Sequence, residues 1–275
     1  SENISSDKIN LTFNIKEIDK FTIERVNIYG NNVTRENVIR NQLALDEGDP
    51  FNDILTKRSV NNIKNLNFFK TVNSEVIRGS TEDSKIINIT VEEKATGEIM
   101  AGAGFGTDGG SISFGVRENN YLGTGVSLDA NLTLKEDSLK GSFSLTDPNY
   151  KNSDKLVYYT IQSTELDKLT DAGYKTNKTG LSLGTKFEYY DDFELGLGID
   201  SFYEKIETDS SASTRQKSQE GDYFDNFLDI QFDYDKRNQK FQTTDGFRNF
   251  YAINLPVISE TSTITNTYSL TNYHQ

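Results

Sequence analysis

The residues with the clearest pattern for chemistry are the glycines between positions 102 and 110. Gly104, Gly106 and Gly109 are spaced as G-x-G-x-x-G, and Asp129 lies twenty positions after Gly109. This spacing matches the dinucleotide-binding fingerprint, in which glycines let the pyrophosphate approach the backbone and the acidic residue binds the ribose. The fingerprint requires a helix directly after the glycines, because the pyrophosphate rests on the helix N-terminus. The neighbouring elements therefore decide whether a nucleotide could bind.

The segment after Gly110 has the period of a strand. Ile112, Phe114 and Val116 alternate with small or charged residues, whereas a helix would place apolar residues three or four positions apart. Without that helix the fingerprint is a weak indication. We therefore expect no cofactor site, and we interpret Asp108-Gly109-Gly110 as a tight hairpin turn. Asp129 is expected to be a strand residue.

Few other residues could carry catalysis or bind a metal ion. The chain has no cysteine and a single histidine, His274. A Ser-His-Asp triad needs a positioned histidine, and structural zinc sites depend on cysteine or histidine ligands, so we expect neither an enzyme nor a metal protein. The net charge of -13, from 42 acidic and 29 basic residues, disfavours nucleic-acid binding, which relies on neutralising phosphates.

Residues 20–95 are expected to form an α+β module with the order β-α-α-β-β. The expected elements are a strand at 21–30, a short helix N-capped by Thr34, a longer helix from Asn52 or Asp53, and strands at 70–78 and 84–94. The apolar positions of the two helices are expected to be Val38, Ile39 and Leu43, followed by Ile54, Leu55, Val60, Ile63 and Leu66.

An internal repeat suggests that this module belongs to an array. "INLTFNIKE" (9–17) resembles "IINITVEEK" (86–94), and the first copy is followed directly by the start of the α+β module. Residues 1–19 are therefore expected to be the final strand of a preceding module of the same kind. On this interpretation the chain begins inside a longer protein.

From Thr96 to the end, residues 96–275, the period of the sequence is that of strands. "GVSLDANLTLK" (125–135) alternates apolar and polar residues throughout, and "SLKGSFSLT" (138–146) repeats the pattern. Looser versions occur at 179–190, 193–203, 227–235 and 246–255, and the longest connection is expected at 205–226, with nothing to bury. The strands approach the ~9–11 residues that cross a membrane when tilted. This favours a membrane β-barrel over a soluble β-sandwich.

The glycines at 102, 104 and 106 remain open to two interpretations within such a strand. They could be small because neighbouring backbone or side chains approach closely. They could instead make a deliberately weak strand, since glycine lowers the stability of a strand. The pattern alone does not choose between these interpretations.

These motifs resemble the BamA family of outer-membrane protein assembly factors. "FTIERVNIYGNNVTRENVIRNQLALDEGDPFN", "NLNFFKTV" and "VEEKATGEI" are similar to its last POTRA domain, and "AGAGFGTDGGSISFGVRENNYLGTGVSL" is similar to its first barrel strands. "SLTDPNY" and "FQTTDGFRNFYAINLP" resemble its later periplasmic turns. The resemblance implies a POTRA domain at 20–95 followed by an antiparallel transmembrane β-barrel. About ten of the family's roughly sixteen strands are expected here.

The resemblance also implies a function and a site. In this family, unfolded β-barrel clients are inserted into the outer membrane of Gram-negative bacteria without ATP or covalent chemistry. The first barrel strand lies at a lateral seam, where its edge templates an incoming client strand. The matching residues are Thr96, Gly97, Glu98, Ile99, Met100, Ala101, Gly102, Ala103, Gly104, Phe105 and Gly106.

Partners follow from the same resemblance. Arg40 and Glu47 match positions associated with docking of the lipoprotein BamD, although a solvated charge pair at a helix end would look the same. Other assembly lipoproteins, periplasmic chaperones and outer-membrane lipid are further expected partners, with the POTRA domain in the periplasm. The closing strands and the family's V-R-G-F motif are expected beyond Gln275.

Three rival functions explain the sequence less completely. A passive porin accounts for the strands but not for the α+β module with its repeat. A TamA-like protein or a two-partner secretion transporter accounts for both and remains the main alternative. A barrel enzyme would need a nucleophile and a base, which one terminal histidine makes hard to supply.

Overall fold

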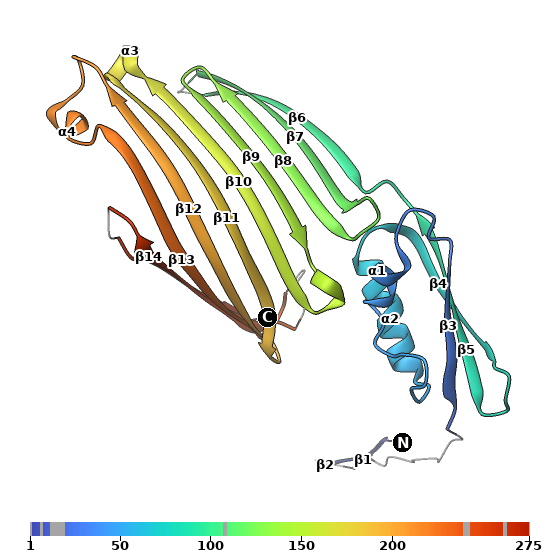
Figure 1. Cartoon of the computed structure of the whole chain (residues 1–275). Helices are drawn as coiled ribbons and strands as arrows, with labels where there is room; N and C mark the ends of the chain where they lie inside the picture. The colour runs from blue at the N-terminus through green and yellow to red at the C-terminus, as the bar shows by residue number, and fades with distance from the viewer. Residues whose placement is uncertain are drawn as a thin grey trace. The chain divides into compact units, whose positions relative to one another are not determined.

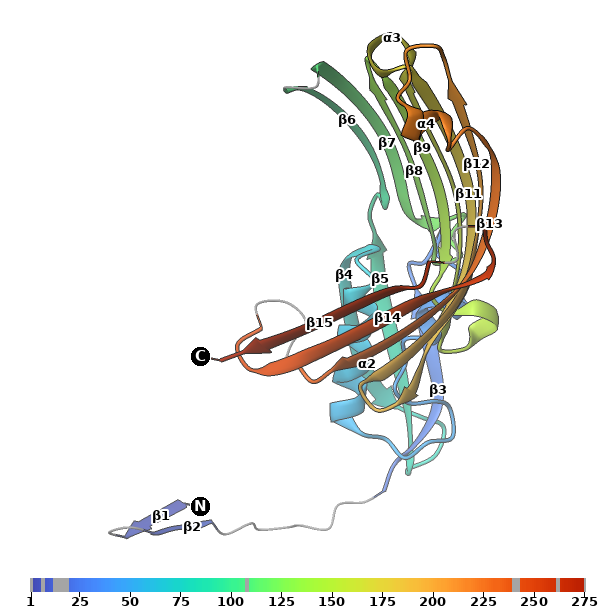
Figure 2. The ribbon, with the colours of Figure 1, turned by 90° about the vertical axis from the view of Figure 1, so that its left-hand side faces the viewer.

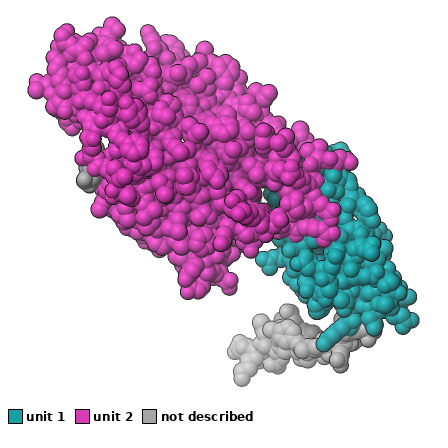
Figure 3. Space-filling model, in the orientation of Figure 1, with its two compact units in different colours: residues 1–31, 42–93 teal, residues 32–41, 94–275 magenta. Residues whose placement is uncertain are grey.

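The structure is a computed structural model that describes residues 2–5, 8–11, 20–106, 109–238, 243–260 and 263–274. The chain divides into two units, the first comprising residues 1–31 and 42–93 and the second residues 32–41 and 94–275 (Figure 3). Among the described residues, no helix is long and apolar enough to cross a membrane.

The first unit contains a three-stranded sheet with a helix packed on it (Figure 1). Its strands are β3 (Thr22–Tyr29), β4 (Phe69–Arg78) and β5 (Ser84–Glu93), in the order β3-β5-β4. β5 pairs in parallel with β3 and antiparallel with β4. The core includes Ile23, Val26, Ile63, Ile87 and Ile89, all at most 1% exposed. Burial of these apolar side chains is the main force that holds the unit together.

The long helix α2 (Asp53–Asn65) begins where its cap predicts. The Asn52 side chain accepts hydrogen bonds from the backbone N–H groups of Ile54 and Leu55, as an N-cap residue should. The apolar face expected for this helix is only partly correct. Val60 and Ile63 are buried, whereas the side chain of Ile54 is 76% exposed because it lies in the first turn.

The short helix α1 (Glu36–Arg40) corrects one expectation. Its N-cap residue is Arg35, which makes no side-chain capping bond, and not Thr34. Thr34 lies one position earlier, and its hydroxyl accepts a hydrogen bond from Asn120, a residue 86 positions away in the chain. A partner so distant in sequence cannot be anticipated from local capping preferences.

The second unit is dominated by an antiparallel sheet in which the ten strands follow chain order (Figures 1 and 2). The strands are β6 (Gly97–Gly106), β7 (Gly109–Tyr121), β8 (Val126–Lys135), β9 (Ser138–Asp147), β10 (Lys155–Lys168), β11 (Tyr174–Tyr190), β12 (Phe193–Thr208), β13 (Gly221–Asp235), β14 (Gly246–Ile258) and β15 (Thr265–Tyr273). Three short helices lie in the connections: η1 (Tyr150–Asn152), α3 (Leu169–Ala172) and α4 (Thr214–Lys217). The expected count of about ten strands is confirmed.

The sheet has two chemically different faces, as the alternation predicts. One face carries apolar side chains in register, such as Phe114 opposite Leu132, and both are largely exposed. The other carries polar pairs such as Arg117 opposite Asp129, whose side chains form an ion pair at 2.8 Å. We call these the apolar face and the polar face. An exposed apolar face this extensive marks contact with lipid or protein.

The longest connection is shorter and more ordered than expected at 205–226. β12 continues to Thr208 and β13 starts at Gly221, because the charged ends of these strands still pair with each other. The residues between them include α4, whose N-cap residue Ser213 makes a full capping box. Ala212 is buried, so the expectation that this connection buries nothing was wrong.

The N-terminal segment forms a small hairpin. β1 (Glu2–Ser5) and β2 (Lys8–Leu11) pair antiparallel with each other. The expected final strand of a preceding module falls largely on residues 12–19, which lie outside the described residues. That assignment therefore stays a prediction.

Candidate functional site

The predicted seam strand is β6, an end strand of the ten-stranded sheet (Figure 2). Its register with β7 runs from Gly97 opposite Glu118 to Gly106 opposite Gly109. All ten of its residues are exposed. An end strand presents main-chain N–H and C=O groups on the side away from its neighbour, which is the basis of pairing with an added strand. Thr96 lies directly before the strand.

The side chains of β6 are apolar on one face, whereas the other carries Glu98 and Met100 near the start of the strand and only glycines from Gly102 onward. Ile99 and Phe105, 87% and 91% exposed, lie on the apolar face. Gly102 and Gly104 pair with Ser113 and Ser111 on the polar face. The strand therefore has an apolar face along its length and a polar face that lacks side chains from Gly102 to Gly106.

The space around these glycines removes one of the two interpretations. A Cβ atom at Gly102 would lie 2.8 Å from the Ser113 hydroxyl, and one at Gly104 would lie 3.2 Å from the Ser111 hydroxyl. At Gly106 nothing lies within 4 Å. A serine hydroxyl can rotate away, and none of the three glycines has a positive φ. Neither close approach nor backbone conformation requires glycine here, so its low strand propensity is the property that remains.

The dinucleotide fingerprint lacks its helix. Residues 109–121 form the strand β7, as the alternation predicts, and Gly106 pairs with Gly109 across the hairpin. Residues 107 and 108 of that hairpin lie outside the described residues. Asp129 lies in β8 and is engaged by Arg117. The G-x-G-x-x-G spacing is thus a coincidence of a glycine-rich strand and its hairpin.

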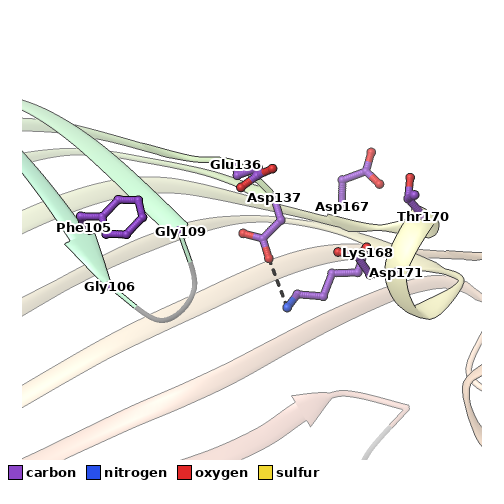
Figure 4. Close-up of a pocket in the computed structure, with 9 residues that line it drawn as sticks. All are labelled: Phe105, Gly106, Gly109, Glu136, Asp137, Asp167, Lys168, Thr170 and Asp171. Atoms are coloured by element: carbon purple, nitrogen blue, oxygen red, sulfur yellow. Dashed lines mark ion pairs between the residues drawn. The ribbon is translucent and has the colours of Figure 1, made fainter.

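An open pocket lies where β6 and β7 meet the β8–β9 and β10–β11 connections (Figure 4). Its lining residues are Phe105, Gly106, Gly109, Glu136, Asp137, Asp167, Lys168, Thr170 and Asp171. Lys168 forms an ion pair with Asp137 at 3.1 Å. Within the described residues, no group of three or more acidic or histidine side chains is arranged to hold a metal ion. The charged side chains that line this pocket are therefore mostly acidic.

The two residues expected at a partner-lipoprotein contact lie in different units. Arg40, in α1, forms an ion pair with Glu36 at 2.7 Å across one helical turn. Glu47 is in the first unit, where one of its carboxylate oxygens accepts a hydrogen bond from the backbone N–H of Val26 at 3.0 Å. Glu47 therefore has a structural role in addition to any contact it makes.

The turn between β7 and β8 was not predicted from the sequence. Gly123 and Gly125 in this turn, and Asn120 near the end of β7, contact residues 32–41 of the same unit. The signal that could have found the turn is "NNYLGTG", since two glycines two positions apart after a strand indicate an unusual backbone conformation.

These features define a class of protein: an α+β module followed by an antiparallel sheet of long strands with one polar and one exposed apolar face. Residues 21–94 match the POTRA family model, described as a surface antigen variable number repeat. Residues 120–274, more than half of the chain, match the Omp85 superfamily domain. The chain belongs to the Omp85 superfamily.

Individual relatives agree with this assignment. The chain is 27% identical over 203 residues to the outer membrane protein assembly factor BamA of Neisseria meningitidis, covering 71% of this chain and 26% of the relative. It is 27% identical over 244 residues to BamA of Nitratidesulfovibrio vulgaris, covering 86% of this chain and 30% of the relative. The chain thus spans less than a third of the length of these relatives. The resemblance to the BamA family is confirmed.

Solved structures share the fold. The crystal structure of BamA from Haemophilus ducreyi lacking POTRA domains 1–3 superposes with a TM-score of 0.69 at 22% identity, covering 86% of this chain and 48% of that one. CdiB from Acinetobacter baumannii superposes with a TM-score of 0.52 at 11% identity, covering 92% and 48%. The predicted architecture, a POTRA domain followed by part of an antiparallel barrel sheet, is confirmed.

Proposed function

We propose that this protein assembles β-barrel proteins into the outer membrane, and that the edge of β6 templates the incoming client strand. The observation that carries the proposal is the position of β6 as an exposed end strand with glycines that nothing around them requires. Relatives named as outer membrane protein assembly factors support the general function.

The chemistry of the proposed step is backbone hydrogen bonding. A client strand that pairs with β6 gains main-chain hydrogen bonds along the edge, which is β-augmentation. The apolar side chains of β6, such as Ile99 and Phe105, would continue the lipid-facing side of the client sheet. The step needs no nucleotide and no covalent intermediate.

The two faces of the sheet support its placement in a membrane, which we propose is the outer membrane of a Gram-negative bacterium. The apolar face suits lipid, whereas the polar face suits a wet interior. If the POTRA domain lies in the periplasm, β6 runs outward from it. The connection between β12 and β13, residues 209–220, then lies outside the cell, where outer-membrane barrels carry their longer loops.

A crosslinking experiment tests the templating step. Because the chain contains no cysteine, a single Ala103→Cys change on β6 can be paired with one cysteine in the terminal strand of a barrel client. We expect a disulfide-linked intermediate during assembly. The matched control is Ala130→Cys, which lies on the same apolar face in the middle of the sheet, in β8. Equal crosslinking at both positions would refute templating at β6.

We also propose that Arg40 and Glu47 contribute to docking of a lipoprotein such as BamD. Arg40 is the cleaner probe, since Glu47 also holds the backbone of β3 through Val26. Arg40→Glu should reduce co-purification of the lipoprotein, and the control Lys57→Glu reverses an exposed charge in α2. Equal recovery of the lipoprotein with both variants would remove Arg40 from the contact. Client barrels, other assembly lipoproteins, periplasmic chaperones and outer-membrane lipid are the remaining proposed partners.

The alternative function is translocation of a polypeptide, as in TamA-like or two-partner secretion proteins. The likeness to CdiB concerns the fold alone. Reconstitution in vesicles separates the two functions. An assembly factor should insert a barrel client into the bilayer, whereas a transporter should move a soluble polypeptide across it.

A further inference from the structure

The turn between β7 and β8 has an unusual backbone. Leu122 adopts a positive φ of 52° next to Gly123 at 71°, and Gly125 follows at 75°. A left-handed conformation is unfavourable for a residue such as leucine. Strain of this kind persists where surrounding contacts impose it, and it concentrates at functional positions.

Besides its own internal hydrogen bonds, the turn is contacted by residues 32–41, which belong to the same unit. The backbone N–H of Arg35 donates to the carbonyl oxygen of Gly123 at 2.8 Å. A Cβ atom on Gly123 would lie 1.9 Å from the carbonyl oxygen of Val33, so no other residue fits there. Unlike the glycines of β6, this glycine is required by its surroundings.

We call the contact of residues 32–41 with the end of β7 and the β7–β8 turn the joint. Asn120 is at its centre. Its side chain is almost fully buried and so is that of Thr34, with exposures of 5% and 2%. The Asn120 amide nitrogen donates to the Thr34 hydroxyl at 2.8 Å, and its amide oxygen accepts from the backbone N–H of Gly125 at 2.8 Å. A buried amide with both ends bonded is costly to disturb, because a lost partner leaves a polar group unsatisfied.

The same joint reaches the start of β6. The backbone N–H of Asn120 donates to a carboxylate oxygen of Glu118 at 2.8 Å, and that oxygen also accepts a hydrogen bond from the hydroxyl of Thr96. The carbonyl oxygen of Thr96 accepts from both the backbone and the side chain of Asn119, at 3.3 and 3.2 Å. Thr96, the residue directly before the seam strand, is therefore bonded to the two residues that precede Asn120.

We propose that Asn120 is a positioning residue that couples residues 32–41 to the base of β6. While Thr34 holds Asn120, the turn keeps Glu118 and Asn119 bonded to Thr96, and the first residues of β6 stay paired with β7. A displacement of residues 32–41 breaks the Thr34 bond and loosens this pairing, which changes the edge offered to a client. The purpose of the coupling rests on the templating function proposed above.

Amide hydrogen exchange, measured on the full-length protein, tests the coupling. In Asn120→Ala we expect the β6 amides at positions 97–101 that bond to β7 to exchange about 10-fold faster, the loss expected for a buried hydrogen bond. Amides of β11 and β12 should be unchanged. The matched control is Asn37→Ala, which removes an exposed contact of the same segment with Asn152 that does not lead to β6.

A second pair of variants guards against a folding defect. Thr34→Val removes the hydroxyl that Asn120 needs and should reproduce the faster exchange, whereas Thr34→Ser retains a hydroxyl and should restore slow exchange. A general folding defect would also speed exchange in β11 and β12. It would not depend on whether residue 34 carries a hydroxyl.

The possible outcomes separate the two proposals. If exchange at the start of β6 in Asn120→Ala and Thr34→Val equals that of Asn37→Ala, the coupling is overturned. If it is faster, and client crosslinks at position 103 change in the same variants, the coupling regulates templating. If the Ala103→Cys protein without any further change forms no such crosslinks, templating at β6 fails, and the exchange difference still decides the role of Asn120.

Discussion

Replacing the three β6 glycines with valine should stiffen the seam strand and slow client assembly. The changes introduce side chains on the polar face: Gly102→Val, Gly104→Val and Gly106→Val. The only atoms within 4 Å of the new Cβ positions are the hydroxyls of Ser113 and Ser111. The new side chains therefore fit with small rotations of Ser111 and Ser113. The change tests the weakness of the strand and does not create a steric block in the sheet.

The expected magnitude follows from strand propensities. Glycine and valine lie near opposite ends of a scale that spans about 1 kcal/mol per residue. Three substitutions, less the adjustment of two serines, should stabilise the pairing of β6 by about 2–3 kcal/mol. Since 1.4 kcal/mol corresponds to a factor of ten, strand opening becomes about 30- to 150-fold less frequent.

Hydrogen exchange of the β6 amides measures this opening directly, and the rate at which a client barrel becomes folded in vesicles measures the function. The control is Gly141→Val in β9, an interior strand, where a Cβ atom would meet only Leu132 at 3.8 Å. The control should leave client folding unchanged.

Two results would refute this explanation of the β6 glycines. If β6 exchange slows by the expected factor while the client folds at its usual rate, a weak seam strand is not needed for assembly. If exchange does not slow, the glycines do not set the stability of the strand, and the proposed reason for their presence fails.

Two further predictions concern the POTRA domain. Ile63→Ala, in the fully buried position of α2, should lower its free energy of unfolding by about 2–5 kcal/mol in urea, whereas Ile54→Ala, at a 76% exposed position, should change it little; equal effects would contradict the core assignment. The pKa of Glu24 lies below its ordinary value because its carboxylate accepts hydrogen bonds from the backbone N–H of Ser80 and then from the hydroxyls of Ser84 and Ser80. The stabilisation is present above the ordinary pKa of about 4.3 and is lost as the pH falls through the lowered value, so Glu24→Gln should flatten the acid limb of the stability profile; an unchanged limb would rule out this group.

The repeating parts of the fold were predictable because their signals are local. The alternation in 125–135 identifies β8 without any knowledge of its neighbours, since side chains of a strand point to alternate faces. The cap at Asn52 likewise depends on atoms within one helical turn. β10, which the pattern did not single out, places Ser163 and Glu165 at apolar-face positions and Tyr158 at a polar-face position, which weakens the period.

The joint at Asn120 could not be predicted because its meaning depends on distant residues. Thr34 has the residue type that is typical of a helix N-cap. Its hydroxyl instead accepts a hydrogen bond from Asn120, which lies 86 positions away in the chain. Leu122 is left-handed within a tight turn that the hydrogen bond from Thr124 N–H to the Tyr121 carbonyl closes, a conformation that the residue type leucine does not predict. Such features appear only when the chain is folded, because tertiary contacts override local preference.

The glycines of this sheet carry opposite physical roles, and the space around each one distinguishes them. At Gly106 a Cβ atom would meet nothing within 4 Å, so the effect of this glycine is the low strand propensity that it gives to β6. At Gly123 a side chain would collide with backbone, so the residue acts through how closely it lets another segment approach. The seam strand is thus weak along its length and held firmly at its base, where Thr96 is bonded to Asn119 and Glu118. Because Glu118 and Asn119 precede the buried Asn120 directly, the base of β6 is the point from which its pairing with β7 can be controlled.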